Sequence, residues 1–251
     1  NLEKLNEIKN ITFISFTNKT NQLPSNIIAF GINIESQMDA LKEYFSKIKI
    51  SKTILLSPKS EYIDESKSVA KKDILKFYRT YSYDTNPKKI TVEIEKITNY
   101  RERKKDLERR IKILEKSDLY KDKAELKKLE QMHTLGKINF DSVFIIDFDE
   151  RLKSVLTSFM YSDVSTDEVK FFTVNQWFDK TLFEEDASKN LHFPSVNFKN
   201  LSKFNEKFFT TFNKKPNEVS ILAYDALGLI YYAWKKNGEI KSVNDFLFKN
   251  K

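Results

Sequence analysis

The chain has 251 residues, of which 40% are hydrophobic and 14% aromatic, and this composition excludes a disordered chain and leaves room for one large or two small domains. Its 44 Lys and Arg side chains outnumber the 36 Asp and Glu, but Lys, Asn and Ile are all abundant and Gly is scarce, which is the bias that AT-rich codons produce, so the charge alone predicts no nucleic-acid partner. The lack of Cys excludes disulfides, thiolate nucleophiles and Cys-ligated metals. The sequence contains no run of 18 apolar residues, so it predicts no membrane span.

The first third of the chain alternates between short apolar runs and amphipathic segments. The runs are rich in β-branched and aromatic residues, and the amphipathic segments repeat their apolar residues at helical intervals. This alternation predicts a parallel sheet covered by helices. The predicted strands are residues 11–16, 27–30, 53–56 and 75–81, and the predicted helices are residues 36–48 and 62–72.

Between Pro87 and His133 this alternation gives way to long polar stretches. In the 30 residues from 101 to 130, 20 are charged, and the remaining apolar residues recur at helical spacing. Pro87 fits the first turn of a helix, and Ser117-Asp118 interrupts the pattern. We therefore expect two antiparallel helices in residues 87–133. They should form a hairpin with a solvated, self-paired charged face that projects from an α/β lobe.

The α/β pattern returns after Gly136 and continues to the last helix. Tyr224, Tyr231, Tyr232 and Trp234 lie on this helix between aliphatic residues, which predicts a buried helix rather than an aromatic binding stripe. The predicted strands or extended segments are residues 142–146, 169–174 and 191–196, and the predicted helices are residues 151–160, 201–212 and 220–234.

No pattern of catalytic residues is found. His133 and His192 have no companions at metal-ligand spacing, and the four Gly residues form no phosphate-binding loop. A nucleophile elbow and a zinc-protease helix are also missing. We therefore expect no enzymatic activity, no catalytic residues, no cofactor and no metal.

Candidate ligand-binding residues come from the geometry of open α/β sheets. Ligands of such sheets lie beyond the carboxyl ends of the strands, where loops are free of the sheet and helix N-termini offer N–H groups. A Trp here could cover a bound solute, or could only pack inside a lobe, and an Asp before a helix could only cap it. The candidates are Thr17, Asn18, Ser57, Asp147, Asp149, Asn175, Gln176 and Trp177.

Three phrases resemble type I periplasmic binding proteins, the leucine/isoleucine/valine-binding class. Residues 27–33, with the sequence IIAFGIN, resemble the first crossover between lobes. Residues 52–56, with the sequence KTILL, resemble the first strand of the second lobe. The Ala-Tyr-Asp-Ala phrase at 223–226, preceded by residues 208–216, resembles the helix pair after the second crossover. The resemblance covers nearly the whole chain.

A narrower resemblance is to the penicillin-binding-protein activator branch of that family. In this branch a charged helical hairpin interrupts the second lobe, as residues 99–103, 134–136 and 140–144 suggest here. The resemblance implies a two-lobed α/β fold with parallel sheets flanked by helices and an incomplete first lobe. Lobe I would comprise residues 1–29 and 197–251, and lobe II would comprise residues 30–196 with the hairpin insertion at 87–133.

The resemblance also implies a function. It predicts a non-enzymatic periplasmic protein that regulates a peptidoglycan synthase through protein contacts, and the alternative is a solute receptor of an ABC transporter for an amino-acid-like ligand. The implied partners are a small molecule and either the synthase or an ABC permease. Membrane attachment would come only through a lipid anchor outside this chain, at the outer membrane. A nucleic-acid-binding role for residues 101–128 is a remote third hypothesis, which steep salt dependence would support.

Overall fold

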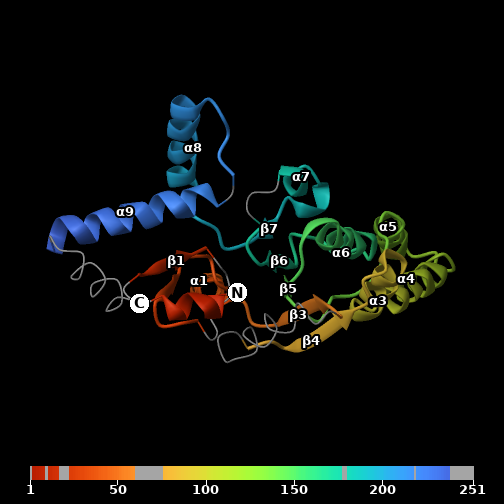
Figure 1. The fold of residues 1–251 in the computed structure, drawn as a ribbon. Coiled ribbons are helices and arrows are strands. Elements are labelled where there is room, and N and C mark those ends of the chain that lie inside the picture. The colour runs from red at the N-terminus through yellow and green to blue at the C-terminus, as the bar shows by residue number, and fades with distance from the viewer. Residues whose placement is uncertain are drawn as a thin grey trace. The chain divides into compact units, whose positions relative to one another are not determined.

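The chain is described by a computed structural model, which places residues 2–8, 11–16, 23–59, 76–176, 180–217 and 219–237 (Figure 1). It divides into two compact units, one formed by residues 1–37 and 195–251 and the other by residues 38–194. The sequence placed the boundaries after residues 29 and 196. The structure places them after residues 37 and 194, and the first of these lies inside the helix α1 (Ile34–Ile48).

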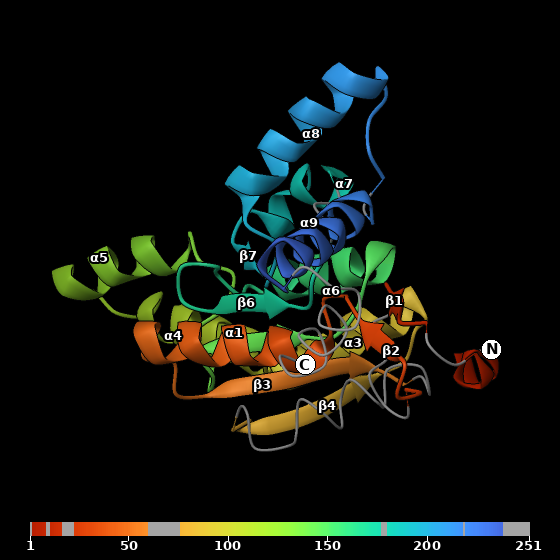
Figure 2. The ribbon, with the colours of Figure 1, turned by 60° about the vertical axis from the view of Figure 1, so that its left-hand side comes forward.

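A five-stranded parallel sheet forms the centre of the unit of residues 38–194. Its strand order is β4-β3-β5-β6-β7, and every neighbouring pair is parallel (Figure 1). Figure 2 shows β3 and β4 side by side from another direction. All residues of β3 and β5 are buried, which explains why these strands read as continuous apolar runs rather than alternating ones. The strands are β3 (Thr53–Pro58), β4 (Arg79–Tyr83), β5 (Ser142–Ile145), β6 (Lys170–Thr173) and β7 (Leu191–His192).

Helices cover both faces of this sheet. The ring of Phe172 in β6 lies 4.5 Å from that of Phe45 in α1, whereas the neighbouring Phe171 lies 5.2 Å from Phe159 in α6 (Asp149–Tyr161). Because successive side chains of a strand point to opposite faces, α1 and α6 lie on opposite sides of the sheet. The short elements α7 (Lys180–Phe183) and η2 (Asp186–Ser188) follow β6. The predicted helix at 62–72 lies outside the described residues.

The segment predicted as one projecting hairpin contains three helices, and the first of them belongs to the core. In α3 (Pro87–Ile97), Ile90 and Ile94 are fully buried and join the main core cluster beneath the sheet. The prediction for residues 87–133 is therefore wrong in its first part. A hairpin is formed only by the next two helices, α4 (Tyr100–Leu114) and α5 (Tyr120–Leu129).

The α4–α5 hairpin has a small apolar cluster of its own, built on Leu107, Leu114 and Leu129. Its base is tied to the rest of the unit by Arg103, which is 8% exposed. The Arg103 guanidinium donates to the Ser162 carbonyl at 3.3 Å and to the Thr134 hydroxyl at 2.6 Å. One buried arginine thus joins α4, the segment after α5 and the loop after α6.

The described residues of the unit 1–37 and 195–251 form a two-stranded parallel sheet and two longer helices. The ring of Phe204 in α8 lies 5.3 Å from that of Tyr224 in α9, so these helices pack on each other. The Asn26 amide donates to the carbonyls of Leu5 and Ile8, which fixes the N-terminal turn beside β2. The elements are η1 (Leu2–Glu7), β1 (Phe13–Ser15), β2 (Ile27–Ala29), α8 (Phe198–Phe212) and α9 (Ser220–Asn237).

The last helix is not the buried helix that its sequence predicts. Tyr231 is 58% exposed and Trp234 is 54% exposed, and Tyr224 and Tyr232 are exposed to a similar degree. The two described strands of this unit have three residues each and offer little apolar surface to an 18-residue helix. Among the described residues no helix is long and apolar enough to cross a membrane.

Candidate functional site

Polar side chains gather at the carboxyl-terminal edge of the five-stranded sheet. Ser57 lies near the end of β3, Tyr83 ends β4, and Asp147 follows β5 by two residues. Asn175 and Gln176 follow β6 in the same way. Because the strands are parallel and in register, these positions share one edge. We call Ser57, Tyr83, Asp147, Arg151, Asn175 and Gln176 the carboxyl-edge cluster.

Asp147 is the centre of this cluster. Its side chain is fully buried, and its carboxylate accepts hydrogen bonds from the Tyr83 hydroxyl, the Phe148 backbone N–H and the Arg151 side chain. The Arg151 Nη2 atom lies 3.0 Å from Oδ1 of Asp147. A buried carboxylate needs such a cation and such donors, because burial otherwise strongly disfavours its charge.

The carboxylate also affects the ionisation of its partners. Burial, and after it the negative charge of Asp147, raises the pKa of Tyr83 far above its usual range, so this phenol stays protonated and acts as a donor. The hydrogen bond with Asp147 raises the pKa of Arg151. The Arg151 side chain is 48% exposed. The cluster therefore holds one guanidinium in a fixed place at the solvent-facing edge of the sheet.

The two amides after β6 hold neighbouring loops. Gln176 Nε2 donates to the Asp147 carbonyl at 3.0 Å and to the Val174 carbonyl at 3.2 Å. Asn175 Nδ2 donates to the carbonyl of Pro194, the last residue of this unit, at 2.8 Å. Both side chains are buried, at 7% and 5% exposure. These contacts fix the loop that carries Asp147 and the segment that leaves the unit.

Ser57 differs from the other members of the cluster. Its side chain is fully buried, and its hydroxyl has no hydrogen-bond partner among the described residues. A buried hydroxyl without a partner costs about 1 to 3 kcal/mol, so a site that retains one is a candidate for contact with a bound molecule.

The structure places the candidates from the sequence in different ways. It brings Ser57, Asp147, Asn175 and Gln176 to one edge, whereas Thr17, Asn18 and Trp177 lie outside the described residues. Asp149 is the first residue of α6, and the N-cap position before it is Phe148, so the expected capping role is wrong. Asp149 instead adopts the left-handed conformation, with φ at 53°.

Sequence reasoning missed Tyr83 and Arg151. Arg151 stands four residues after Asp147, a spacing that could have signalled the ion pair across the start of α6. Nothing in the local sequence connects Tyr83 with Asp147, which is 64 residues away. No group of three or more His, Asp or Glu side chains able to hold a metal ion occurs among the residues that the structure describes.

Comparisons with known proteins identify similar folds only among solved structures. No protein-family model matches the chain, and no curated protein matches it. A branched-chain amino acid ABC transporter periplasmic ligand-binding protein from Burkholderia xenovorans matches with a TM-score of 0.60 at 9% identity, over 98% of this chain and 59% of that one. A leucine-, isoleucine-, valine-, threonine- and alanine-binding protein from Brucella ovis, in a closed conformation, matches with a TM-score of 0.58 at 12% identity, over 97% and 59%.

A third match is an extracellular ligand-binding receptor from Verminephrobacter eiseniae, with a TM-score of 0.50 at 10% identity, over 88% of this chain and 57% of that one. The chain thus spans a little under three fifths of the length of these structures. At such low identity these likenesses show the fold, and they confirm the fold class predicted from the sequence.

Proposed function

We propose that this chain, which has the type I periplasmic-binding-protein fold, is a non-enzymatic ligand-binding protein that holds a small amino-acid-like solute at its carboxyl-edge cluster. In this proposal residues 38–194 are the second lobe, and residues 1–37 with 195–251 are part of the first. The observation that carries the proposal is the carboxyl-edge cluster itself. There a buried Asp147 fixes a half-exposed Arg151, and the Ser57 hydroxyl has no hydrogen-bond partner within the described part of the chain.

The chemistry of the cluster suits a carboxylate-bearing solute. Nε and Nη2 of Arg151 face Asp147, which leaves Nη1 able to donate to a ligand oxygen. The Ser57 hydroxyl can serve as a second donor. Two of the similar structures are named as binding proteins for branched-chain or other small amino acids, which supports the same ligand class here. The corresponding partner would be an ABC permease, and the compartment would be the periplasm.

The test measures the binding of leucine, isoleucine, valine, threonine and alanine to the 251-residue chain by thermal unfolding and by calorimetry. We expect at least one of them to raise the unfolding temperature. Arg151→Gln should lower the affinity for that ligand about ten-fold or more, as expected for the loss of a charge-assisted hydrogen bond. Ser57→Ala should weaken binding without lowering the stability of the ligand-free chain, because its buried hydroxyl has no hydrogen-bond partner to lose among the described residues.

The matched control is Arg109→Gln, which removes one exposed arginine from the α4–α5 hairpin. It should leave ligand affinity unchanged. If none of the five amino acids stabilises the chain, or if Arg151→Gln and Arg109→Gln have the same effect, the proposal is wrong.

A second candidate function is regulation of a peptidoglycan synthase through protein contacts, by a protein anchored to the outer membrane through a lipid outside this chain. The observation that favours it is the α4–α5 hairpin, which Arg103 holds rigidly at its base. Its tip exposes Leu119 at 67% and Tyr120 at 87%, side chains that suit a protein contact. Excising residues 105–133 should abolish capture of a purified synthase but leave amino-acid binding intact. Unchanged capture would exclude this role of the hairpin.

A further inference from the structure

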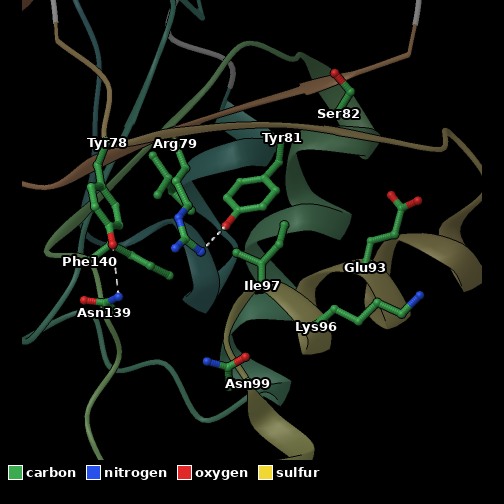
Figure 3. A pocket seen from close by; sticks show the side chains of 11 residues that line it. Tyr78, Arg79, Tyr81, Ser82, Glu93, Lys96, Ile97, Asn99, Asn139 and Phe140 are labelled. Carbon is green, nitrogen blue, oxygen red and sulfur yellow. Dashed lines mark hydrogen bonds between the residues drawn. The ribbon is translucent and has the colours of Figure 1, made fainter.

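A pocket lies beside β4, and none of its lining residues belongs to the carboxyl-edge cluster. It has a volume of about 370 Å³, within the range of small-molecule sites, and is bounded by β4, the last turn of α3 and the residues just before β5 (Figure 3). Tyr78 and Arg79 stand at the start of β4, and Asn139 and Phe140 precede β5. These four positions are at the amino ends of their strands, whereas Tyr81 and Ser82 carry the lining along β4 toward Tyr83.

The charge of this pocket is positive. Neither Arg79 nor Lys96 has an ion-pair partner among the described residues, and both line the pocket. Glu93 is the one acidic residue among the described residues that line the pocket. Its carboxylate already accepts a hydrogen bond from the Asp84 backbone N–H at 3.0 Å and lies 3.7 Å from Nζ of Lys59. Two cations are therefore left to attract an anion.

The position of Arg79 is fixed by aromatic neighbours. Its guanidinium lies 5.2 Å from the centre of the Tyr78 ring and donates to the Tyr81 hydroxyl at 3.5 Å. Figure 3 shows the guanidinium between these two tyrosines. The Tyr78 hydroxyl in turn accepts from the Asn139 amide at 3.1 Å. A guanidinium held in this way loses little side-chain freedom when it binds a planar anion.

The floor of the pocket is apolar. Ile54 and Phe140 are buried beneath it, and Ile97 and Tyr81 are partly buried at its wall. Asn99 adds an amide whose side chain does not cap α4. An apolar floor with two cations at the rim suits a molecule that has a flat hydrocarbon body and one anionic end.

We propose that this pocket is a second binding site, specific for a small aromatic carboxylate. The carboxylate would pair with Arg79, and the ring would lie on Tyr81, Ile97 and Phe140. The positive charge of Lys96, on the other side of the pocket, would add to the attraction (Figure 3). Carboxylate matches the planar guanidinium through two parallel N–H···O bonds, and aromatic rings gain from edge or offset contact with tyrosine. This site does not depend on the function proposed for the carboxyl-edge cluster.

The test uses 4-fluorobenzoate as the probe and follows its ¹⁹F transverse relaxation as the 251-residue chain is added. Neutral 4-fluorobenzyl alcohol serves as the uncharged comparison. We expect the wild-type chain to bind the benzoate at least about ten-fold more tightly than the alcohol, because the alcohol lacks the charge that the two cations recognise. Arg79→Gln should remove most of this preference, and Lys96→Gln should reduce it.

Two controls locate the site. Lys88→Gln removes one positive charge from the exposed first turn of α3, outside the pocket, and should leave the affinity unchanged. Arg151→Gln tests whether the probe binds at the carboxyl-edge cluster, and should also have no effect. The proposal is overturned if the chain does not bind the benzoate, or if it binds benzoate and alcohol equally. It is also overturned if Arg151→Gln lowers the benzoate affinity while Arg79→Gln and Lys96→Gln do not. Arg79 and Lys96 are both exposed, so either variant alone should fold and permit the test.

Discussion

The helices α3 and α4 follow each other in the chain with only Thr98 and Asn99 between them, yet they play different roles. Both are amphipathic and rich in charge. In α3, Ile90 and Ile94 are fully buried against the sheet, whereas α4 contributes Leu107 and Leu114 to a small cluster shared with α5. An apolar stripe therefore indicates that a helix packs against other residues, but it does not indicate which residues these are.

The change of partner occurs at the junction. The Thr98 hydroxyl donates to the Ile94 carbonyl at 2.8 Å and closes the last turn of α3. Asn99 then adopts the left-handed conformation, with φ at 51°, which an Asn tolerates better than most residues. After this turn the α4 leucines pack in a small cluster with α5 and Leu135 instead of joining the main core.

The largest effect is expected when α3 is removed together with the α4–α5 hairpin, compared with removal of the hairpin alone. Excising residues 87–133 removes Ile90 and Ile94 from the core, and we expect cooperative unfolding in urea to be lost. Excising only residues 105–133 should preserve it, because the Leu135 N–H donates to the Arg103 carbonyl at 3.0 Å and a short linker can join the ends. If the two excisions behave alike, the assignment of α3 to the core is wrong.

Single truncations should show the same contrast on a smaller scale. Ile94→Ala should lower the free energy of unfolding by about 2 to 5 kcal/mol, because it leaves a cavity under the sheet. Leu114→Ala should cost less in global unfolding, since the hairpin can open locally while the sheet stays folded. Val92→Ala in α3, at 40% exposure, is the control and should change little. Equal losses for Ile94→Ala and Leu114→Ala, measured by urea titration, would contradict the contrast.

Arg103 tests what joins the two regions. Burial lowers the pKa of its guanidinium, and the hydrogen bonds to Ser162, Thr134 and Asp163 offset the cost of that burial. Arg103→Met should leave these acceptors unpaired and lower stability by about 1 to 3 kcal/mol. Amide hydrogen exchange should accelerate in α4 and α5 far more than in β3 and β5. Arg101→Met, which changes a mostly exposed side chain, is the control. Equal acceleration of exchange in all these elements would argue against the role of Arg103 in joining the hairpin to the rest of the unit.

The smallest expected effect concerns Tyr83 in the core region. Its pKa is raised in the folded chain, so the stability that it contributes is fully present below the usual tyrosine pKa near 10 and falls as the pH rises above that value. Tyr83→Phe should lower stability at neutral pH by about 1 kcal/mol, since Asp147 loses one donor. It should also flatten the decline in unfolding temperature above pH 10. Tyr120→Phe, at an exposed phenol in the hairpin, should leave that decline unchanged, and identical profiles for wild type and Tyr83→Phe would refute this role.

Much of the sheet could be predicted from local pattern. Strands at 142–146 and 169–174 were found because buried parallel strands are continuous apolar runs, and their carboxyl ends pointed to Asp147, Asn175 and Gln176. The exposed aromatic face of α9 was not predicted, because an apolar helix looks the same whether or not a layer covers it. Trp234 shows this most plainly, at 54% exposure.

The sequence by itself determined the fold class and the edge of the sheet where polar residues follow the strands, because periodicity and strand ends are local properties of the chain. Only the tertiary structure decided which groups meet. It paired Tyr83 with Asp147 across 64 residues, placed α3 rather than α4 in the core, and brought Arg79 and Lys96 to the lining of one pocket. The physical reason is that burial, ion pairing and pocket shape depend on contacts between distant segments, which short-range patterns do not encode.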